Sequence, residues 1–531
     1  MRFWYCLASL AAVVCLDACC ASAQDCHGLV GKNFRDARII ETDEVVPPFA
    51  ITGLGDPKGV SVKTPFCRAR GIIKPSSDSD INFEVWLPPV GTWNGRYEGV
   101  GNGGFAGTVI YEAMYLALQA GYAASGTDTG HSGFMNESLW ALGHPEKVKD
   151  LGWRAIHETA VASKEIITAY YGKAAAYSYY SGCSTGGRQG LVEAQRFPGD
   201  YNGIVVGAPA NYWPQLLASD LLTIQTVSAK PENWVSPEKL AFVQTKAMEA
   251  CNAENGIIDD PSQCHFNPSS LICKEGRAEG CLSATEVATL QEIYSGLKDA
   301  NDTTIYPGFP PGGEAAWGRS KMGPGRGQLT ESLTYPMPTG FFRYLAFGNL
   351  DWDFRKVNPM DVLRQAVNSA ADRAVYSSDP DLNAFREAGG KLIQYHGWND
   401  PAIPAGSSIK YYESVATKMG GVEKIKTFYR LFMAPGMEHC GGGPGPNTVT
   451  GVFGESAPSH DPDHDVVAAV AHWVEDGVAP TQITATLYRD TDRGKEIVAQ
   501  RPWCAYPAIA HYSGHGDRSQ ASSYACVAPH E

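Results

Sequence analysis

The distribution of apolar residues predicts alternating strands and helices over the first two hundred residues. Segment 81–87 alternates apolar and polar positions and ends at two prolines, which is typical of a strand. Segment 149–171 has the apolar spacing of a helix that buries one face. The other predicted elements are a strand-rich region 26–100, helices 108–121 and 185–195, and strands 122–127, 176–181 and 203–207. This order predicts a mostly parallel sheet covered by helices on both faces.

The pattern changes near residue 211. Residues 211–378 lack a strand–helix alternation and include a stretch rich in proline and glycine. The alternation returns after Gly390, where we predict strands 391–395 and 427–433 and helices 409–418 and 466–474. The simplest account is one α/β domain interrupted by an insertion. The predicted boundaries are 24–210 and 379–531 for the two parts of the α/β domain and 211–378 for the inserted lid domain.

The first 23 residues have the features of a secretion signal. Arg2 is basic, residues 3–16 are uncharged and mostly apolar, and Ala21-Ser22-Ala23 matches a small-residue cleavage site. The apolar stretch is shorter than the roughly 20 residues that a membrane-spanning helix needs. We therefore expect cleavage before Gln24 and a secreted protein, extracellular or periplasmic, that has no membrane partner.

Composition narrows the function classes further. The formal net charge is −14 and no run of Lys or Arg occurs, which argues against a nucleic-acid partner, because phosphate-binding faces need clustered basic charge. Of the 14 cysteines, four lie in the first 23 residues, which leaves ten. An even number is typical of disulfides in an exported protein. The absence of a CxxC pair among these ten argues against zinc.

The segment Gly182-Cys183-Ser184-Thr185-Gly186 matches the G-x-S-x-G motif of a nucleophilic serine. A strand is predicted before it and a helix after it, so Ser184 would lie on a tight strand-to-helix turn. Small residues two positions before and after the serine avoid collisions in such a turn. An ordinary glycine-rich turn is the alternative, but the order of strand, motif and helix favours a catalytic serine.

A nucleophilic serine needs a base, and the base needs an orienting acid. In α/β folds with this motif the chain order is serine, acid, histidine. Asp400 follows the strand predicted at 391–395, and His439 follows the strand predicted at 427–433, so these are the expected acid and base. His396 is expected to line the site or to be structural. The later histidines that compete with His439 are His460, His464 and His472.

Two cysteines flank these candidates. Cys183 directly precedes Ser184, and Cys440 directly follows His439. A disulfide between them would join the nucleophile and base loops. A pairing of each cysteine elsewhere is the alternative.

A second glycine-rich segment could supply an oxyanion hole. Residues 101–107 follow an early predicted strand and have small residues at their centre. The backbone N–H of Gly103 or Gly104, with that of Thr185, would bind the oxyanion of an acyl-transfer reaction. A flexible turn is the alternative for this segment.

Together these motifs resemble the tannase and feruloyl esterase family, which also contains mono(2-hydroxyethyl) terephthalate hydrolase. The resemblance rests on Cys-Ser-Thr-Gly-Gly-Arg-Gln-Gly (183–190), Gly-Asn-Gly-Gly-Phe-Ala-Gly (101–107), Gly-Thr-Asp-Thr-Gly-His (126–131) and the Cys183/Cys440 pair. It extends over essentially the whole mature chain. It implies an α/β-hydrolase fold with a large inserted lid domain and a Ser184, Asp400 and His439 triad. The implied disulfides are Cys26–Cys67, Cys183–Cys440, Cys251–Cys264, Cys273–Cys281 and Cys504–Cys526.

The sequence departs from this family at the calcium loop of the lid. The loop 251–261 is shorter than the family's and has Asn255 where an Asp is expected. Glu254, Asp259 and Asp260 could offer oxygens, but their spacing differs from that of the family site. We therefore expect no required cofactor and assign no metal ligands, and the shortened loop argues against structural calcium.

The resemblance implies hydrolysis of aromatic carboxylic esters, with feruloyl or other hydroxycinnamoyl esters expected first. Galloyl and terephthaloyl esters are alternatives, as are a peptidase on the same fold and a catalytically silent binding protein. The partner would be a small aromatic ester or an ester-decorated plant polysaccharide, and the oligomeric state stays open. Family lids form an aromatic pocket, although packing within the lid is the alternative for each candidate. The candidate substrate contacts are His396, Trp317, Phe341 and Phe342.

Overall fold

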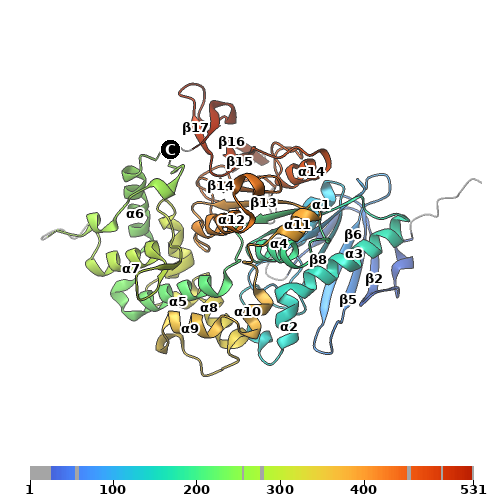
Figure 1. The fold of residues 1–531 in the computed structure, drawn as a ribbon, viewed down its shortest axis with the longest axis horizontal. Helices are drawn as coiled ribbons and strands as arrows, with labels where there is room; N and C mark the ends of the chain where they lie inside the picture. Colours follow the sequence, from blue (N-terminus) through green and yellow to red (C-terminus); the bar gives the residue numbers. More distant parts are fainter. Residues whose placement is uncertain are drawn as a thin grey trace, which may run out of the picture.

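The computed structural model describes residues 25–53, 59–253, 256–274, 280–450, 456–491 and 494–528. The predicted secretion signal 1–23 lies outside these residues. Figure 1 shows a central sheet with helices on both faces and a further group of helices, coloured green to yellow, at one side. No helix in the described part of the chain is long and apolar enough to cross a membrane.

The central sheet has ten strands in the order β1-β2-β5-β6-β8-β7-β9-β10-β13-β14. Pairing is antiparallel from β1 to β8 and parallel from β8 to β14. The parallel half confirms the prediction from the apolar pattern, and β10 has the predicted bounds. The strands are β1 (Asn33–Phe34), β2 (Ala37–Val45), β5 (Phe66–Ile73), β6 (Ile81–Leu87), β7 (Arg96–Val100), β8 (Ala123–Thr127), β9 (Tyr177–Cys183), β10 (Gly203–Gly207), β13 (Lys391–Gly397) and β14 (Tyr429–Ala434).

Two apolar cores lie on opposite faces of this sheet. One core contains residues of α3 (Ala155–Tyr171), α4 (Thr185–Arg196) and α12 (Gly406–Met419). The other contains residues of α1 (Tyr111–Gln119) and α14 (Val466–Asp476). The predicted helix 149–171 begins as a π-helical turn, η3 (Asp150–Arg154), before α3. Short elements nearby are α2 (Pro145–Lys149), α13 (Val422–Ile425), β3 (Phe49–Ile51) and β4 (Val60–Val62).

The segment between β10 and β13 contributes no described strand to the central sheet. Apart from the short pair β11 (Leu297–Lys298) and β12 (Thr304–Tyr306), its described regular structure is helical. Its apolar core includes Phe105 and Leu151 of the preceding part of the chain, so the inserted helices pack against the glycine-rich segment 101–107. Its helices are α5 (Trp213–Ala229), α6 (Pro237–Ala250), α7 (Ala284–Ser295), α8 (Pro336–Gly340), α9 (Pro359–Ala366), α10 (Ala370–Val375) and α11 (Asn383–Glu387). The domain boundaries at 211 and 378 stay a prediction.

The C-terminal region adds strands that the sequence analysis did not identify. An antiparallel hairpin lies beside β14 and is followed by a second antiparallel strand pair that packs against the hairpin (Figure 1). These strands are β15 (Gln482–Thr491), β16 (Gly494–Cys504), β17 (Ile509–Tyr512) and β18 (Tyr524–Val527). The ten cysteines form the five disulfides that the family resemblance implied.

Candidate active site

Ser184 forms the turn between β9 and α4. Its backbone has φ 62° and ψ −119°, a conformation that costs free energy for a residue with a side chain and that is common at functional sites. The Ser184 N–H donates to the carbonyl of Gly207 at 3.0 Å, which holds the turn against the end of β10. Ser184 is partly exposed, whereas its neighbours Cys183 and Thr185 are buried.

Gly182 and Gly186 are needed for this turn on steric grounds. A Cβ at Gly182 would lie 2.6 Å from the carbonyl oxygen of Gly186. A Cβ at Gly186 would lie 2.9 Å from the carbonyl oxygen of Asn102. The two glycines therefore allow the strand, the helix and the glycine-rich segment to meet at Ser184.

Asp400 and His439 come from the turns after β13 and β14. The Nδ1 atom of His439 lies 2.6 Å from Oδ2 of Asp400. The other carboxylate oxygen, Oδ1, accepts the N–H groups of Ala402 at 2.8 Å and Ile403 at 2.9 Å. The Asp400 side chain is fully buried, whereas 26% of the His439 side chain is exposed. His439 therefore connects a buried carboxylate to an accessible surface.

The environment of Asp400 favours its ionised form. Burial by itself would raise the pKa of this carboxyl group, but electrostatic attraction and hydrogen bonds from the two neighbouring imidazoles, those of His439 and His396, outweigh burial and hold the pKa well below its usual range. An ionised Asp400 accepts the Nδ1 hydrogen of His439. The Nε2 atom of the neutral imidazole is then able to accept a proton.

A disulfide ties the nucleophile turn to the histidine turn. Cys183 and Cys440 are bonded, and their Cα atoms are 5.9 Å apart. Both are buried, and each is the direct neighbour of Ser184 or His439. Segments 257 positions apart in the sequence are thereby joined next to both candidate catalytic residues.

The glycine-rich segment is held in place by most of its own amides. Gly101 donates to Ser181, Asn102 to the Gln189 side chain, and Phe105 to Met135, at 2.9, 3.0 and 2.7 Å. These acceptors belong to β9, to α4 and to the turn that precedes α2. The segment is therefore fixed on three sides against the strand-to-helix turn that carries Ser184, which we call the nucleophile elbow.

Three amides at this place have no acceptor among the described residues. They are the N–H groups of Gly103, Gly104 and Thr185. The Thr185 hydroxyl donates to the Gly104 carbonyl at 2.6 Å, so the two segments that carry these amides are directly joined. This is the donor set that the sequence predicts for an oxyanion hole.

The four candidate substrate contacts lie inside the protein. His396, Phe341 and Phe342 are 0% exposed and Trp317 is 1% exposed. Phe341 stacks on Trp213 at 5.9 Å, so it packs within the lid. The expectation that these side chains touch substrate is therefore corrected: the three aromatic residues are lid core, and His396 contacts Asp400 instead, with its Nε2 atom 3.2 Å from Oδ2.

The sequence analysis missed an exposed apolar group beside the glycine-rich segment. Phe134, Met135 and Leu139 are 49%, 38% and 60% exposed. The Met135 carbonyl oxygen accepts the Phe105 N–H and would be the nearest atom to a Cβ on Gly104, so Met135 borders the glycine-rich segment at Gly104. Residues 132–140 have no periodic pattern, so no signal in the sequence marks them as neighbours of the elbow.

The described residues of the lid loop do not fit a calcium site. Asp259 forms an ion pair with Arg501 at 2.7 Å, and Asp260 accepts from Ser262. Glu254 and Asn255 lie outside the described residues. Elsewhere in the described chain, His157, Glu193 and Asp200 lie close together, but His157 and Lys164 already contact the Asp200 carboxylate.

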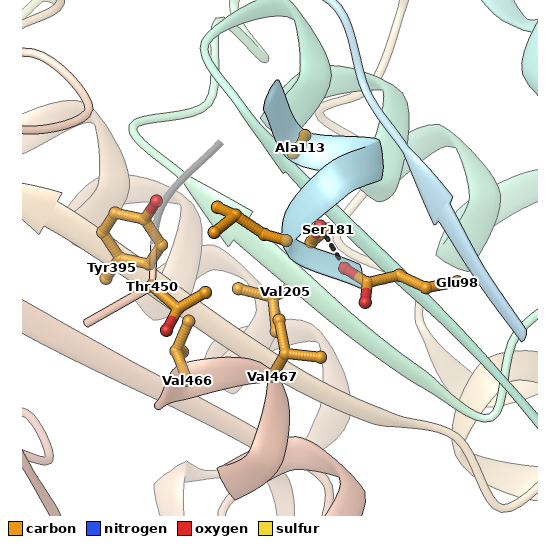
Figure 2. Close-up of a pocket in the computed structure, with 10 residues that line it drawn as sticks. Glu98, Ala113, Ser181, Val205, Tyr395, Thr450, Val466 and Val467 are labelled. Carbon is orange, nitrogen blue, oxygen red and sulfur yellow. Dashed lines mark hydrogen bonds between the residues drawn. The ribbon is translucent and has the colours of Figure 1, made fainter. Parts of the chain in front are cut away.

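Figure 2 shows a small internal cavity behind the elbow. It is lined in part by Ser181, Gly182 and Glu98, and its volume is about 20 Å³. That is room for one water molecule and too little for an ester. The Ser181 hydroxyl donates to Glu98 at 2.7 Å. Burial raises the pKa of Glu98 to about 7.

Comparison with known proteins identifies relatives over most of the chain. A family model described as tannase and feruloyl esterase matches residues 67–527. An uncharacterized esterase of Xanthomonas campestris pv. campestris is 34% identical over 98% of this chain and 94% of its own length. Feruloyl esterase C of Talaromyces stipitatus is 33% identical over 87% of this chain and 85% of its own length.

Solved structures agree with these relatives. Feruloyl esterase B from Aspergillus oryzae has a TM-score of 0.84 and 30% identity, covering 95% of this chain and 99% of that one. Tannin acyl hydrolase from Aspergillus niger, at 23% identity, shares the fold, with a TM-score of 0.73 over 94% of each chain. The chain therefore belongs to the tannase and feruloyl esterase family and is a carboxylic ester hydrolase with an α/β-hydrolase fold.

Proposed function

We propose that this protein is a secreted serine esterase that hydrolyses aromatic carboxylic esters through a Ser184, His439 and Asp400 triad. The main observation behind the proposal is that the turn of His439, which contacts Asp400, is joined to the turn of Ser184. His439 contacts Asp400 at 2.6 Å, and the Cys183–Cys440 disulfide connects its turn to that of Ser184. Feruloyl or other hydroxycinnamoyl esters are the proposed substrates, because several relatives at 30–33% identity are named feruloyl esterases.

The proposed reaction is acyl transfer in two steps. Ser184 Oγ attacks the ester carbonyl while His439 Nε2 accepts its proton, and Asp400 stabilises the imidazolium that forms. The amides of Thr185 and of Gly103 or Gly104 bind the oxyanion. His439 then protonates the leaving alcohol. Water, activated by His439, hydrolyses the acyl-enzyme and regenerates Ser184.

An aromatic acyl group is supported by the exposed apolar side chain of Met135 beside the proposed oxyanion hole and by the exposed Phe134 and Leu139 close to it in the chain. A flat ring attached to the ester carbonyl would cover part of this surface, and burial of apolar area favours binding. The substrate would be a small aromatic ester or an ester-decorated plant polysaccharide. Secretion is supported by the signal pattern at residues 1–23 and by the five disulfides.

The test is hydrolysis of methyl ferulate, methyl gallate and mono(2-hydroxyethyl) terephthalate by the purified mature protein. We expect turnover of methyl ferulate and its loss in Ser184→Ala. The matched control is Ser181→Ala, which changes a serine of β9, three residues before Ser184, whose hydroxyl contacts Glu98. This variant should keep its activity. Undiminished activity of Ser184→Ala would refute the triad. Selective turnover of gallate or terephthalate would reassign the acyl group.

A further inference from the structure

A second histidine contacts the carboxylate of Asp400. His396 is the penultimate residue of β13 and is 0% exposed. Its Nε2 atom lies 3.2 Å from Oδ2 of Asp400 and 3.0 Å from the carbonyl oxygen of Ile403. Its Nδ1 atom lies 2.7 Å from the hydroxyl of Ser408 on α12. Both ring nitrogens are therefore engaged, and neither faces solvent.

These contacts determine where the proton of His396 resides. A backbone carbonyl only accepts hydrogen bonds, so the contact with Ile403 requires a hydrogen on Nε2. The ionised Asp400 carboxylate also accepts from this N–H. Ser408 Oγ already accepts from Gln394, so its own hydroxyl hydrogen is available to His396 Nδ1. His396 is therefore neutral, and its Nδ1 atom accepts the hydroxyl hydrogen of Ser408.

The hydrogen-bond chain continues away from the active site. Ser408 Oγ accepts from the side-chain amide of Gln394 at 2.6 Å. The Gln394 side-chain carbonyl accepts the phenol hydrogen of Tyr429, also at 2.6 Å. All these side chains are buried. Every donor points in one direction, from Tyr429 through Gln394, Ser408 and His396 to Asp400, so the tautomer of His396 is determined at both of its nitrogens.

We propose that His396 is a positioning residue that acts through Asp400. It supplies the fourth hydrogen bond to this carboxylate. Oδ1 accepts the amides of Ala402 and Ile403, and Oδ2 accepts His439 and His396. The inference deepens the proposed function and rests on it, since Asp400 matters for catalysis only if His439 is the base.

The neutral donor has a specific physical effect. Oδ2 is the oxygen that must face His439 Nδ1, and a second N–H on this oxygen restricts rotation of the carboxylate without adding a charge that would repel the imidazolium of His439. Loss of the donor leaves Oδ2 with one partner. The transition state, in which His439 is charged, is then destabilised more than the complex with bound substrate. We therefore expect kcat to fall while KM changes little.

The experiment compares variants that remove the donor with one that keeps it. His396→Phe and His396→Met remove it, whereas the side-chain amide of His396→Gln can still donate to Asp400. For methyl ferulate, we expect the first two to lower kcat about 10- to 100-fold, the effect of losing a hydrogen bond to a charged group. His396→Gln should recover most of the loss. The matched control is His460→Phe, which breaks a His–Asp pair outside the triad and should keep the wild-type kcat.

Folding of each variant is checked by near-ultraviolet circular dichroism and thermal unfolding. A folded Phe or Met variant with wild-type kcat, or a Gln variant as slow as these two, would overturn the inference. If neither the His396→Phe nor the His396→Met variant folds, Ser408→Ala is measured instead. A lower kcat at unchanged KM in this variant supports the inference, and a wild-type kcat overturns it. Activity that survives in Ser184→Ala would instead refute the proposed function.

Discussion

Removal of the Cys183–Cys440 disulfide is expected to lower the free energy of unfolding. The bond joins residues 257 positions apart. Closing a loop of this length contributes about 5.5 kcal/mol at 25 °C in the chain-entropy model. Two shorter disulfides within the loop and relaxation of the folded state reduce this figure. We therefore expect Cys183→Ala/Cys440→Ala to lose about 2–5 kcal/mol.

The same change is expected to lower turnover. Ser184 and His439 are each one residue from a bonded cysteine, and the Cα atoms of these cysteines are 5.9 Å apart. Without the bond, only non-covalent contacts hold the His439 turn to the sheet, such as the hydrogen bond from the Asn399 N–H to the Met437 carbonyl at 2.9 Å. A displacement of about 1 Å between nucleophile and base reduces kcat by up to about 100-fold.

The assay pairs urea unfolding with kcat for methyl ferulate at a temperature where every variant is folded. The control is Cys504→Ala/Cys526→Ala, which opens a loop of only 22 positions on the C-terminal strands. Its expected loss is at most about 3.4 kcal/mol, with kcat unchanged. Wild-type kcat in the folded Cys183/Cys440 double variant would refute the positioning role. An equal or larger stability loss in the control would refute the loop-closure reasoning.

Two further predictions concern buried charges. Because burial raises the pKa of Glu98 from 4.5 to about 7, the folded protein retains its proton longer than the unfolded chain, so stability falls as pH rises between these values. In urea unfolding, the free energy of unfolding of Glu98→Gln should therefore exceed that of the wild type by up to about 3 kcal/mol at pH 8, but by little at pH 4.5. An equal difference at both pH values would contradict this reasoning. Lys321 and Asp220 form a buried ion pair at 2.6 Å in the lid. Asp220→Asn should lower the free energy of unfolding by about 3–5 kcal/mol, because it leaves the Lys321 ammonium group unpaired. The double variant Asp220→Asn/Lys321→Met should recover much of this loss. Equal losses in the single and the double variant would refute the pairing argument.

The parallel half of the sheet could be predicted because its signals are local. Strand 203–207 is a short apolar run, and helix α4 follows directly from a glycine motif that only a tight turn explains. The C-terminal hairpin of β15 and β16 escaped prediction because much of its outer half is exposed, so it lacks a clear apolar pattern.

The candidate triad could be predicted for a similar reason. Each of its members follows a recognisable strand, and the chain order of serine, acid and base is a property of the sequence itself. Side-chain burial is different, because it depends on which elements meet. Phe341, Phe342 and Trp317 have the composition of a substrate pocket, but their packing partners are distant in the sequence, and these contacts place them inside the lid.

By itself the sequence determined the order of the elements, the position of Ser184 in its turn, the family resemblance and the residues expected to act with this serine. Only the tertiary structure decided that His396 contacts Asp400, that no described residue accepts the amides of Gly103 and Gly104, and that Met135 borders Gly104. The physical reason is the distance along the chain between the residues that interact. Turns and periodicity depend on neighbouring residues, whereas a hydrogen-bond partner or a buried face depends on segments that meet only when the chain has folded.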